Sequence, residues 1–174
     1  CGLHMNAFDH SPEQIVVQSL FADGHIKYSA RPAAEAQSGM ALIHICEQIV
    51  PDSRQDMSWQ PAPWGMSMNL SREVPIKIAG ALREFMQRLA KESGADLPQL
   101  LKHGHFAIHP GGPKIIDAAQ RTLELSDWQV ESSREVLLNR GNMSSATLPH
   151  VWKKMLDDQL PSGTRVVSLA FGPG

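Results

Sequence analysis

The chain has 174 residues, of which 42% are hydrophobic and 20% are charged, so it has the size and composition of one globular domain. Its net charge of -2 and the absence of a basic run argue against a nucleic-acid partner. The two cysteines form no disulfide framework, and the longest apolar stretch, near residues 41–46, is far too short to cross a bilayer, so we expect a cytoplasmic protein.

Local patterns in the first 70 residues predict one helix and three strands. Residues 11–14 (SPEQ) have the pattern of a capping box, which predicts a helix to about residue 22. After a turn at an Asp-Gly pair, alternating polarity over residues 25–30 predicts a strand. The apolar, β-branched run 41–50 predicts a buried strand, whereas the prolines of residues 51–64 predict a loop. Alternation over residues 66–70 predicts the third strand.

The remainder of the chain predicts mainly helices. Apolar residues recur with helical period over residues 78–89, and Gly94 lies where a glycine ends a helix. In chain order we then expect a helix at 97–103, a strand at 106–109, a helix from Pro113 to about residue 123, a helix at 133–138, a break at 141–145, a helix that carries residues 151–156, and a strand at 166–171.

Strands and helices mixed in this way favour the α/β class, with a mixed sheet covered by helices in α/β/α layers. We expect residues 1–174 to form a single domain. Because the chain opens on Cys1 and its last apolar segment reaches the final residue, we also expect it to be part of a longer protein.

His109 is the first candidate catalytic residue. It ends a predicted strand and precedes the rigid turn Pro110-Gly111-Gly112-Pro113. Ligands of open α/β sheets bind beyond the carboxyl ends of strands, and the two glycines allow a substrate to approach the backbone closely. His109 is therefore expected to face a ligand.

Asn142 is the second candidate, within the small-residue segment 141–146 (GNMSSA). Asparagine and serine are ordinary capping residues at a helix boundary, which is the alternative to a catalytic role. However, an amide N–H and an imidazole N–H directed at one oxygen would stabilise an enolate or a tetrahedral oxyanion. His109 and Asn142 are predicted to supply such a pair.

Four segments together resemble the C-terminal half of a type III polyketide synthase, of the chalcone and stilbene synthase family within the thiolase superfamily. Three of them occur in the order and spacing of that family: residues 109–115 (HPGGPKI), 141–146 (GNMSSA) and 171–174 (FGPG). The fourth, residues 18–24 (QSLFADG), resembles the family segment that precedes a strand of the sheet. The resemblance covers essentially the whole chain and is weakest between residues 31 and 63.

The resemblance implies a thiolase-like fold and a decarboxylative Claisen condensation. A cysteine thiolate would accept an acyl group from coenzyme A, and malonyl-CoA would lose carbon dioxide and extend the bound chain. The positions of His109 and Asn142 would hold the thioester oxygen, and His109 would also pair with the thiolate. Acyl-CoA and malonyl-CoA would be substrates, with no permanently bound cofactor, in a homodimer.

The resemblance places the nucleophilic cysteine in an N-terminal half that lies upstream of this chain. Cys46 is predicted to be a small buried hydrophobic residue inside a strand. Cys1 has no preceding residues that could shape a nucleophile turn. We therefore expect the N-terminal half to be a partner of this chain, and the chain alone to be inactive.

Further substrate-binding positions follow from the same resemblance. Met68 matches a bulky gatekeeping position of the cavity, although core packing is the ordinary alternative. Lys114 matches the mouth of the coenzyme A tunnel but could equally be a solvated lysine, and Ser144 could contact the site or cap a helix. The other expected contacts are Gly111 and Gly112 in the turn, and Phe171, Gly172 and Pro173 in the loop that shapes the cavity.

Three alternatives remain at this point. A ketoacyl-acyl carrier protein synthase of the same superfamily usually differs after the histidine. A non-catalytic thiolase-fold module for dimerisation would need no cysteine, and a simple acyl-ligand binding module would bind coenzyme A thioesters by itself. A metal site at His103, His105 and His109 is disfavoured, because strand alternation separates these side chains and no acidic or thiolate ligand accompanies them.

Overall fold

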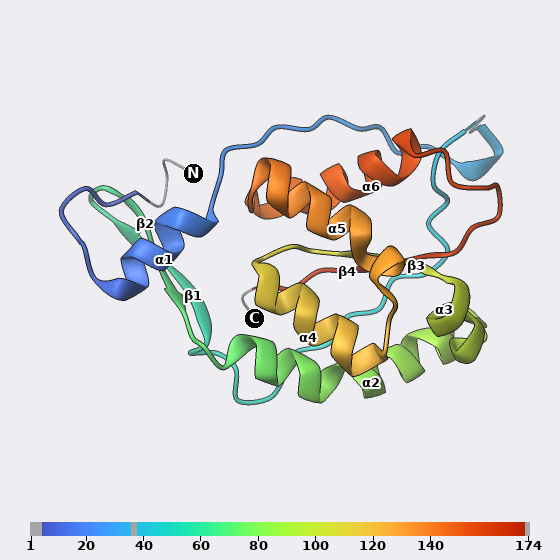
Figure 1. The fold of residues 1–174 in the computed structure, drawn as a ribbon, viewed down its shortest axis with the longest axis horizontal. Coiled ribbons are helices and arrows are strands. Elements are labelled where there is room, and N and C mark those ends of the chain that lie inside the picture. The colour runs from blue at the N-terminus through green and yellow to red at the C-terminus, as the bar shows by residue number, and fades with distance from the viewer. Residues whose placement is uncertain (1–4, 36–37, 173–174) are drawn as a thin grey trace.

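The computed structural model describes residues 5–35 and 38–172. Two parallel strands, β3 (His105–Ile108) and β4 (Val166–Leu169), lie between two layers of helices (Figure 1). One layer holds α2 (Val74–Ser93) and α4 (Pro113–Leu123), and the other holds α5 (Asp127–Arg140) and α6 (Thr147–Asp157). The predicted α/β class with helices on both sides of the strands is confirmed.

Strand alternation divides the interior into two cores. Phe106 and Ile108 point to one face of β3 and pack with α2 and α4, whereas Ala107 points to the other face and packs with α5 and α6. All three side chains are fully buried. Since successive side chains of a strand point to opposite faces, one short strand serves both helix layers.

A buried serine completes the hydrogen bonding of β3. The backbone of His109 donates to the Leu169 carbonyl of β4 at 2.7 Å, on one edge of the strand. On the opposite edge, the Ser133 hydroxyl of α5 accepts from the Ile108 N–H at 2.9 Å and donates to the Phe106 carbonyl at 3.3 Å. Ser133 thus takes the place of a neighbouring strand, because buried backbone groups need partners.

Replacing Ser133 with alanine should lower the free energy of unfolding by about 1–3 kcal/mol, because two buried backbone groups lose their partner. Chemical denaturation of the full-length protein measures this difference. The matched control is Ser132→Ala on the same helix, where the half-buried side chain should contribute less than about 0.5 kcal/mol. Equal effects of the two substitutions would contradict the role of Ser133.

A second sheet lies beside the layered core. It is an antiparallel hairpin of β1 (Met57–Ala62) and β2 (Gly65–Leu70), in which Trp59 pairs with Met68. The predicted strand at 66–70 is confirmed, but the predicted loop at 51–64 is wrong because β1 lies within it. Pro61 obscured the strand pattern, although proline is tolerated in the edge strand of a two-stranded hairpin.

Two other predicted strands are wrong. Within the described ranges, residues 25–30 and 41–50 form no strand and are largely exposed. Leu42 and Ile49 are 75% and 79% exposed, so the run 41–50 is not buried. Its apolar, β-branched composition favours extended structure, but a strand also needs a neighbouring edge with which to pair. The structure therefore contains two strand pairs in place of one continuous mixed sheet.

The helices largely follow the sequence. α1 (Pro12–Leu20) begins at the predicted cap, where the Ser11 hydroxyl accepts from the Gln14 N–H at 3.3 Å. α2, α3 (Leu97–His103), α4 and α6 coincide with predicted helices, and α5 extends the predicted 133–138 helix in both directions. Two short 3-10 helices, η2 (Ala33–Glu35) and η3 (Ser144–Ala146), complete the described elements. No helix among them has the length and apolar character needed to cross a membrane.

Candidate active site

His109 lies directly after β3, where the chain leaves the buried strand pair. The backbone turns sharply behind it, since the Gly111 N–H donates to the His109 carbonyl at 2.8 Å. The imidazole lies beside this bend, since a Cβ on Gly111 would be in ordinary van der Waals contact with it, 3.6 Å from its Nε2 atom. The predicted contact of Gly111 with a ligand stays a prediction.

Burial controls the protonation of His109. Desolvation lowers the pKa of His109 below its ordinary value of 6.5, because burial disfavours the charged imidazolium. The ring is consequently neutral at pH 7 and carries one N–H donor and one acceptor nitrogen. Because the unfolded chain takes up this proton more readily, the contribution of His109 to stability falls as the pH decreases below about 6.5.

Asn142 is held rigidly at the end of α5. Its side chain is only 3% exposed, and its Oδ1 atom accepts from the Ser144 N–H at 3.0 Å. The Thr147 hydroxyl lies 3.4 Å from the same oxygen but donates its hydrogen to the Ser144 carbonyl at 2.7 Å. These bonds fix the orientation of the amide, so its Nδ2 atom faces the turn after His109. Nδ2 donates to the Gly111 carbonyl at 3.3 Å, which uses one of its two hydrogens.

The two candidate catalytic residues meet at Gly111. The His109 ring lies against this glycine, and the Asn142 amide binds its carbonyl oxygen. The residues are 33 positions apart in sequence, on separate layers of the fold. This arrangement brings an imidazole and a carboxamide to one turn.

The remaining predicted residues of the turn and of η3 have distinct environments. Gly112 is buried, and a Cβ there would lie 3.3 Å from the Leu20 side chain at the end of α1. Lys114 is exposed in the first turn of α4, which agrees with a solvated lysine. Ser144 adopts a left-handed φ of 55°, and its backbone N–H donates to the Asn142 side chain. The backbone of Ser144 therefore helps to orient the Asn142 amide.

The other predicted substrate-binding residues lie after β4 and on the hairpin. Phe171 packs against the core formed with α2 and α4, and Gly172 is exposed, whereas Pro173 lies outside the described residues. Met68 is half-buried on β2 opposite Trp59. The structure gives no direct contact between Met68 and His109 or Asn142.

Phe21 connects the hairpin with Asn142, a role that sequence reasoning missed. Its ring packs edge-on against Trp59 at a centroid distance of 6.4 Å. The backbone around it pairs with Asn142, whose carbonyl accepts from the Ala22 N–H at 2.8 Å. The sequence contained this residue within the family-like segment 18–24, but only the long-range backbone pairing shows that it borders the site.

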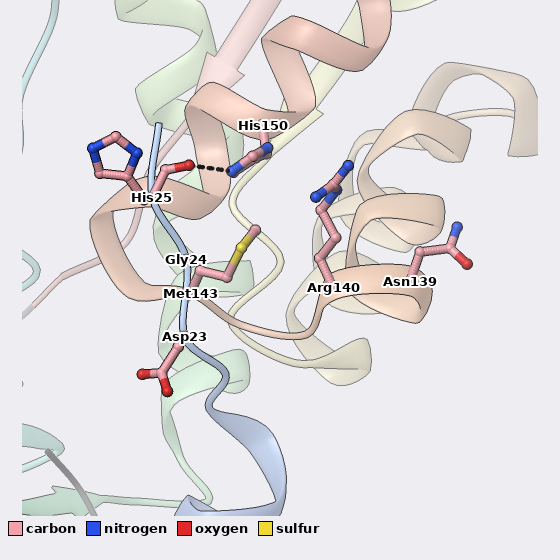
Figure 2. Close-up of a pocket in the computed structure, with 7 residues that line it drawn as sticks. All are labelled: Asp23, Gly24, His25, Asn139, Arg140, Met143 and His150. Atoms are coloured by element: carbon pink, nitrogen blue, oxygen red, sulfur yellow. Dashed lines mark hydrogen bonds between the residues drawn. The ribbon is translucent and has the colours of Figure 1, made fainter. Parts of the chain in front are cut away.

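A pocket of about 390 Å³ lies beside Met143 (Figure 2). The lining residues come from the segment after α1, the end of α5 and the start of α6: Asp23, Gly24, His25, Asn139, Arg140, Met143 and His150. His109 and Asn142 do not line it, so this pocket is separate from the turn at Gly111.

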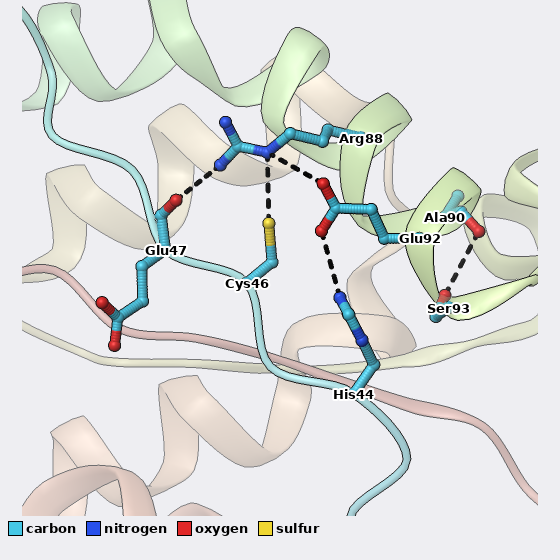
Figure 3. A network of polar contacts seen from close by, with 7 residues as sticks. All are labelled: His44, Cys46, Glu47, Arg88, Ala90, Glu92 and Ser93. Carbon is cyan, nitrogen blue, oxygen red and sulfur yellow. Dashed lines mark hydrogen bonds and ion pairs between the residues drawn. The ribbon is translucent and has the colours of Figure 1, made fainter.

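Cys46 differs from its prediction. It belongs to no strand and is half-buried, and its sulfur accepts from the Arg88 Nε atom of α2 at 3.2 Å (Figure 3). Glu92 lies 3.9 Å from the same Nε, and its other oxygen binds His44 at 3.2 Å, which lowers the pKa of Glu92. These polar contacts attach the segment 41–50 to α2 where strand pairing was expected. Cys1 lies outside the described residues.

Metal ligation has no geometric support in the described part of the chain. No group of three or more His, Cys, Asp or Glu side chains there is arranged to hold a metal ion. His105, one of the histidines considered for a metal, instead packs edge-on against the Trp128 ring at 5.0 Å between ring centroids.

Comparison with known proteins places these features in a family context. Residues 41–174 match the model of the chalcone and stilbene synthases, C-terminal domain. Type III polyketide synthase C of Arabidopsis thaliana is 30% identical over 169 residues, which cover 94% of this chain and 44% of the relative. The chain therefore spans less than half of the length of this relative.

Solved structures agree with the sequence relatives. The C-terminal type III polyketide synthase domain of Steely1 from Dictyostelium is 26% identical, with a TM-score of 0.63 over 71% of this chain and 34% of that one. PKS-I of the brown alga Ectocarpus siliculosus is 22% identical, with a TM-score of 0.75 over 95% of this chain and 46% of that one. The second similarity concerns the fold alone.

Proposed function

Because this chain belongs to the chalcone and stilbene synthase family, as the C-terminal domain of a type III polyketide synthase, we propose that it supplies the oxyanion-binding half of an acyltransferase site. The reaction is the condensation of malonyl-CoA with an acyl-CoA starter. Decarboxylation breaks the bond between the malonyl carboxyl group and its neighbouring carbon, which releases carbon dioxide and leaves an enolate. This carbanion then attacks the enzyme-bound acyl thioester, whose cysteine thiolate departs.

The meeting of His109 and Asn142 at Gly111 is the observation that supports this proposal. Nδ2 of Asn142 has a second hydrogen with no partner among the described residues, and a neutral imidazole provides another N–H. Two fixed donors that converge on one oxygen stabilise the negative charge of the enolate. Because hydrogen bonds hold the Asn142 amide in place before substrate binds, little reorganisation of this donor opposes the reaction.

The proposal also requires an N-terminal half that provides the nucleophilic cysteine. The exposed apolar side chains of residues 41–50 support such a partner, since an extended run without a paired strand offers both backbone and apolar surface to another segment. We further propose that the complete protein is a homodimer and that this chain alone is inactive. Coenzyme A thioesters are substrates in this scheme, and no cofactor is bound permanently.

A product assay with the full-length protein tests the function. The protein should be offered a panel of acyl-CoA starters with labelled malonyl-CoA, and the label should appear in carbon dioxide and in extended products. The same assay on residues 1–174 alone should give neither. If the full-length protein released no labelled carbon dioxide with any starter, the proposed reaction would be wrong.

Met68 offers a test of substrate selection. Replacing it with phenylalanine should reduce kcat/KM for long acyl-CoA starters about tenfold relative to short ones, because a larger ring opposite Trp59 narrows the passage. Competition between two starters of different length measures this ratio. The control is Met40→Phe, the same change at an exposed methionine, which should leave the ratio unaltered. An unchanged ratio for Met68→Phe would favour the packing role.

A further inference from the structure

The pocket beside Met143 has a chemical character of its own (Figure 2). Among the residues that line it, Met143 has the one apolar side chain. Apart from Gly24, the others are charged or polar. Its volume of about 390 Å³ lies near the lower end of the range for small-molecule sites. A pocket of this size and polarity suits a small charged group better than an acyl chain.

Arg140 supplies a cation that no carboxylate neutralises. Arg140 is exposed at the end of α5 and has no ion pair among the described residues. Three other helical arginines each lie within 4 Å of a carboxylate, namely Arg83, Arg88 and Arg134. The ordinary role of a cation at this position is to interact with the helix dipole, but this role does not explain a pocket in front of it.

His150 adds a second polar group next to Arg140. Its Nε2 atom lies 3.3 Å from the His25 carbonyl and donates to it, so the Nδ1 side of the ring remains without a partner in the described chain. Figure 2 shows the His150 ring and the Arg140 guanidinium on the same side of the segment 23–25, whereas the carboxylate of Asp23 and the ring of His25 turn away from them. Asp23, the one acidic residue among those that line the pocket, therefore points away from the side that holds Arg140 and His150.

The wall of the pocket is closely packed. A Cβ added to Gly24 would lie 2.6 Å from the Cβ and Cγ atoms of Met143, so only glycine permits this approach of the two segments. Met143 is itself buried against α5 and α6. The segment 23–25 is therefore held at a defined distance from Arg140 and His150.

We propose that this pocket binds a phosphate group between the Arg140 guanidinium and the His150 imidazole. A guanidinium can donate two parallel hydrogen bonds to phosphate oxygens, and the Nδ1 atom of the His150 ring can accept a hydrogen bond from a phosphate hydroxyl. The phosphate can be free or can belong to a coenzyme A thioester. The proposal does not depend on the condensation chemistry, because neither His109 nor Asn142 takes part.

Calorimetric titration of the full-length protein tests this site with three probes: inorganic phosphate, coenzyme A and 3′-dephospho-coenzyme A. Arg140→Gln should weaken binding of at least one phosphate probe about tenfold or more, since a hydrogen bond to a charged group is lost. The matched control is Arg121→Gln, which removes an exposed arginine from the last turn of α4 and should leave every affinity unchanged. Chemical denaturation of both variants verifies that each remains folded.

The probes also identify the source of the phosphate. Dependence of inorganic phosphate binding on Arg140 indicates a site for free phosphate. Dependence that appears with coenzyme A and disappears with the 3′-dephospho form indicates the 3′-phosphate of the substrate. The proposal is overturned if no probe binds more weakly to Arg140→Gln, or if Arg121→Gln weakens binding equally. Decarboxylation measured in the same samples shows separately whether the condensation site functions.

Discussion

Replacing His109 with alanine should reduce the rate of malonyl-CoA decarboxylation by the full-length protein about 100-fold to 1,000-fold, the usual effect of removing one oxyanion donor. The imidazole lies beside Gly111, and burial keeps the ring neutral at pH 7 by lowering its pKa. Release of labelled carbon dioxide under saturating malonyl-CoA measures the effect. The loss should occur in kcat as well as in kcat/KM, because the hydrogen bond from His109 to the thioester oxygen strengthens as negative charge develops on that oxygen.

A second histidine provides the control for this result. His103 is exposed at the end of α3 and lies six residues before His109, so His103→Ala should retain the rate of the unaltered protein. The free energy of unfolding of both variants should be measured in parallel. A folded His109→Ala variant that decarboxylates malonyl-CoA at the unaltered rate would exclude the proposed role.

Asn142→Ala should reduce the same rate, but its interpretation needs the structural readout. The buried Asn142 side chain also accepts from the half-buried Ser144 N–H and donates to the Gly111 carbonyl, so its removal costs about 1–3 kcal/mol of stability. A loss of rate in protein that remains fully folded supports the donor role. If the folded variant kept the unaltered rate, Asn142 would not be an oxyanion donor, and its role would be to shape the turn that leads into α6.

Replacing Phe106 with alanine should lower the free energy of unfolding by about 3–5 kcal/mol. Phe106 is the largest fully buried side chain, and it packs between β4, α2 and α4. Its truncation leaves a cavity at the centre of the larger core, which the neighbouring strand and helices cannot fill completely. Since a domain typically has only about 5–15 kcal/mol of stability, this single change removes a large part of it.

Phe8 is the matched control for Phe106. Its ring is 95% exposed, so Phe8→Ala should alter the free energy of unfolding by less than about 0.5 kcal/mol. Denaturant titration of the full-length protein compares the two variants. Similar small changes for both would show that the layer between β3, α2 and α4 is not the stabilising core described above.

The helices and the chemistry of the turn could be predicted from sequence because their causes are local. The Ser11 cap, the glycine at 94 and the proline at 113 set helix ends through bonds and backbone angles within a few residues. β3 was also predictable, since Phe106 and Ile108 alternate with Ala107. The segment 41–50 shows the limit of such reasoning, because its composition favours a strand while its pairing depends on a distant edge.

The candidate site also has some features that could be predicted from sequence and others that could not. Sequence alone selected His109 and Asn142 as candidates by residue type and context, and it associated the chain with a family through motifs whose spacing can be read directly. It did not show Phe21 beside Asn142, nor that Cys46 contacts Arg88, because these contacts join residues more than 40 positions apart. They depend on how the helix layers pack.

By itself, then, the sequence determined the secondary structure that short-range bonding controls, and the residue types available for catalysis. Tertiary structure alone decided that the Asn142 amide binds the Gly111 carbonyl and that Arg140 and His150 line one pocket. It also decided that the Ser133 hydroxyl, and not another strand, binds the free edge of β3. The physical reason is that helix capping and periodicity act over a few residues, whereas burial and strand pairing depend on the whole folded chain.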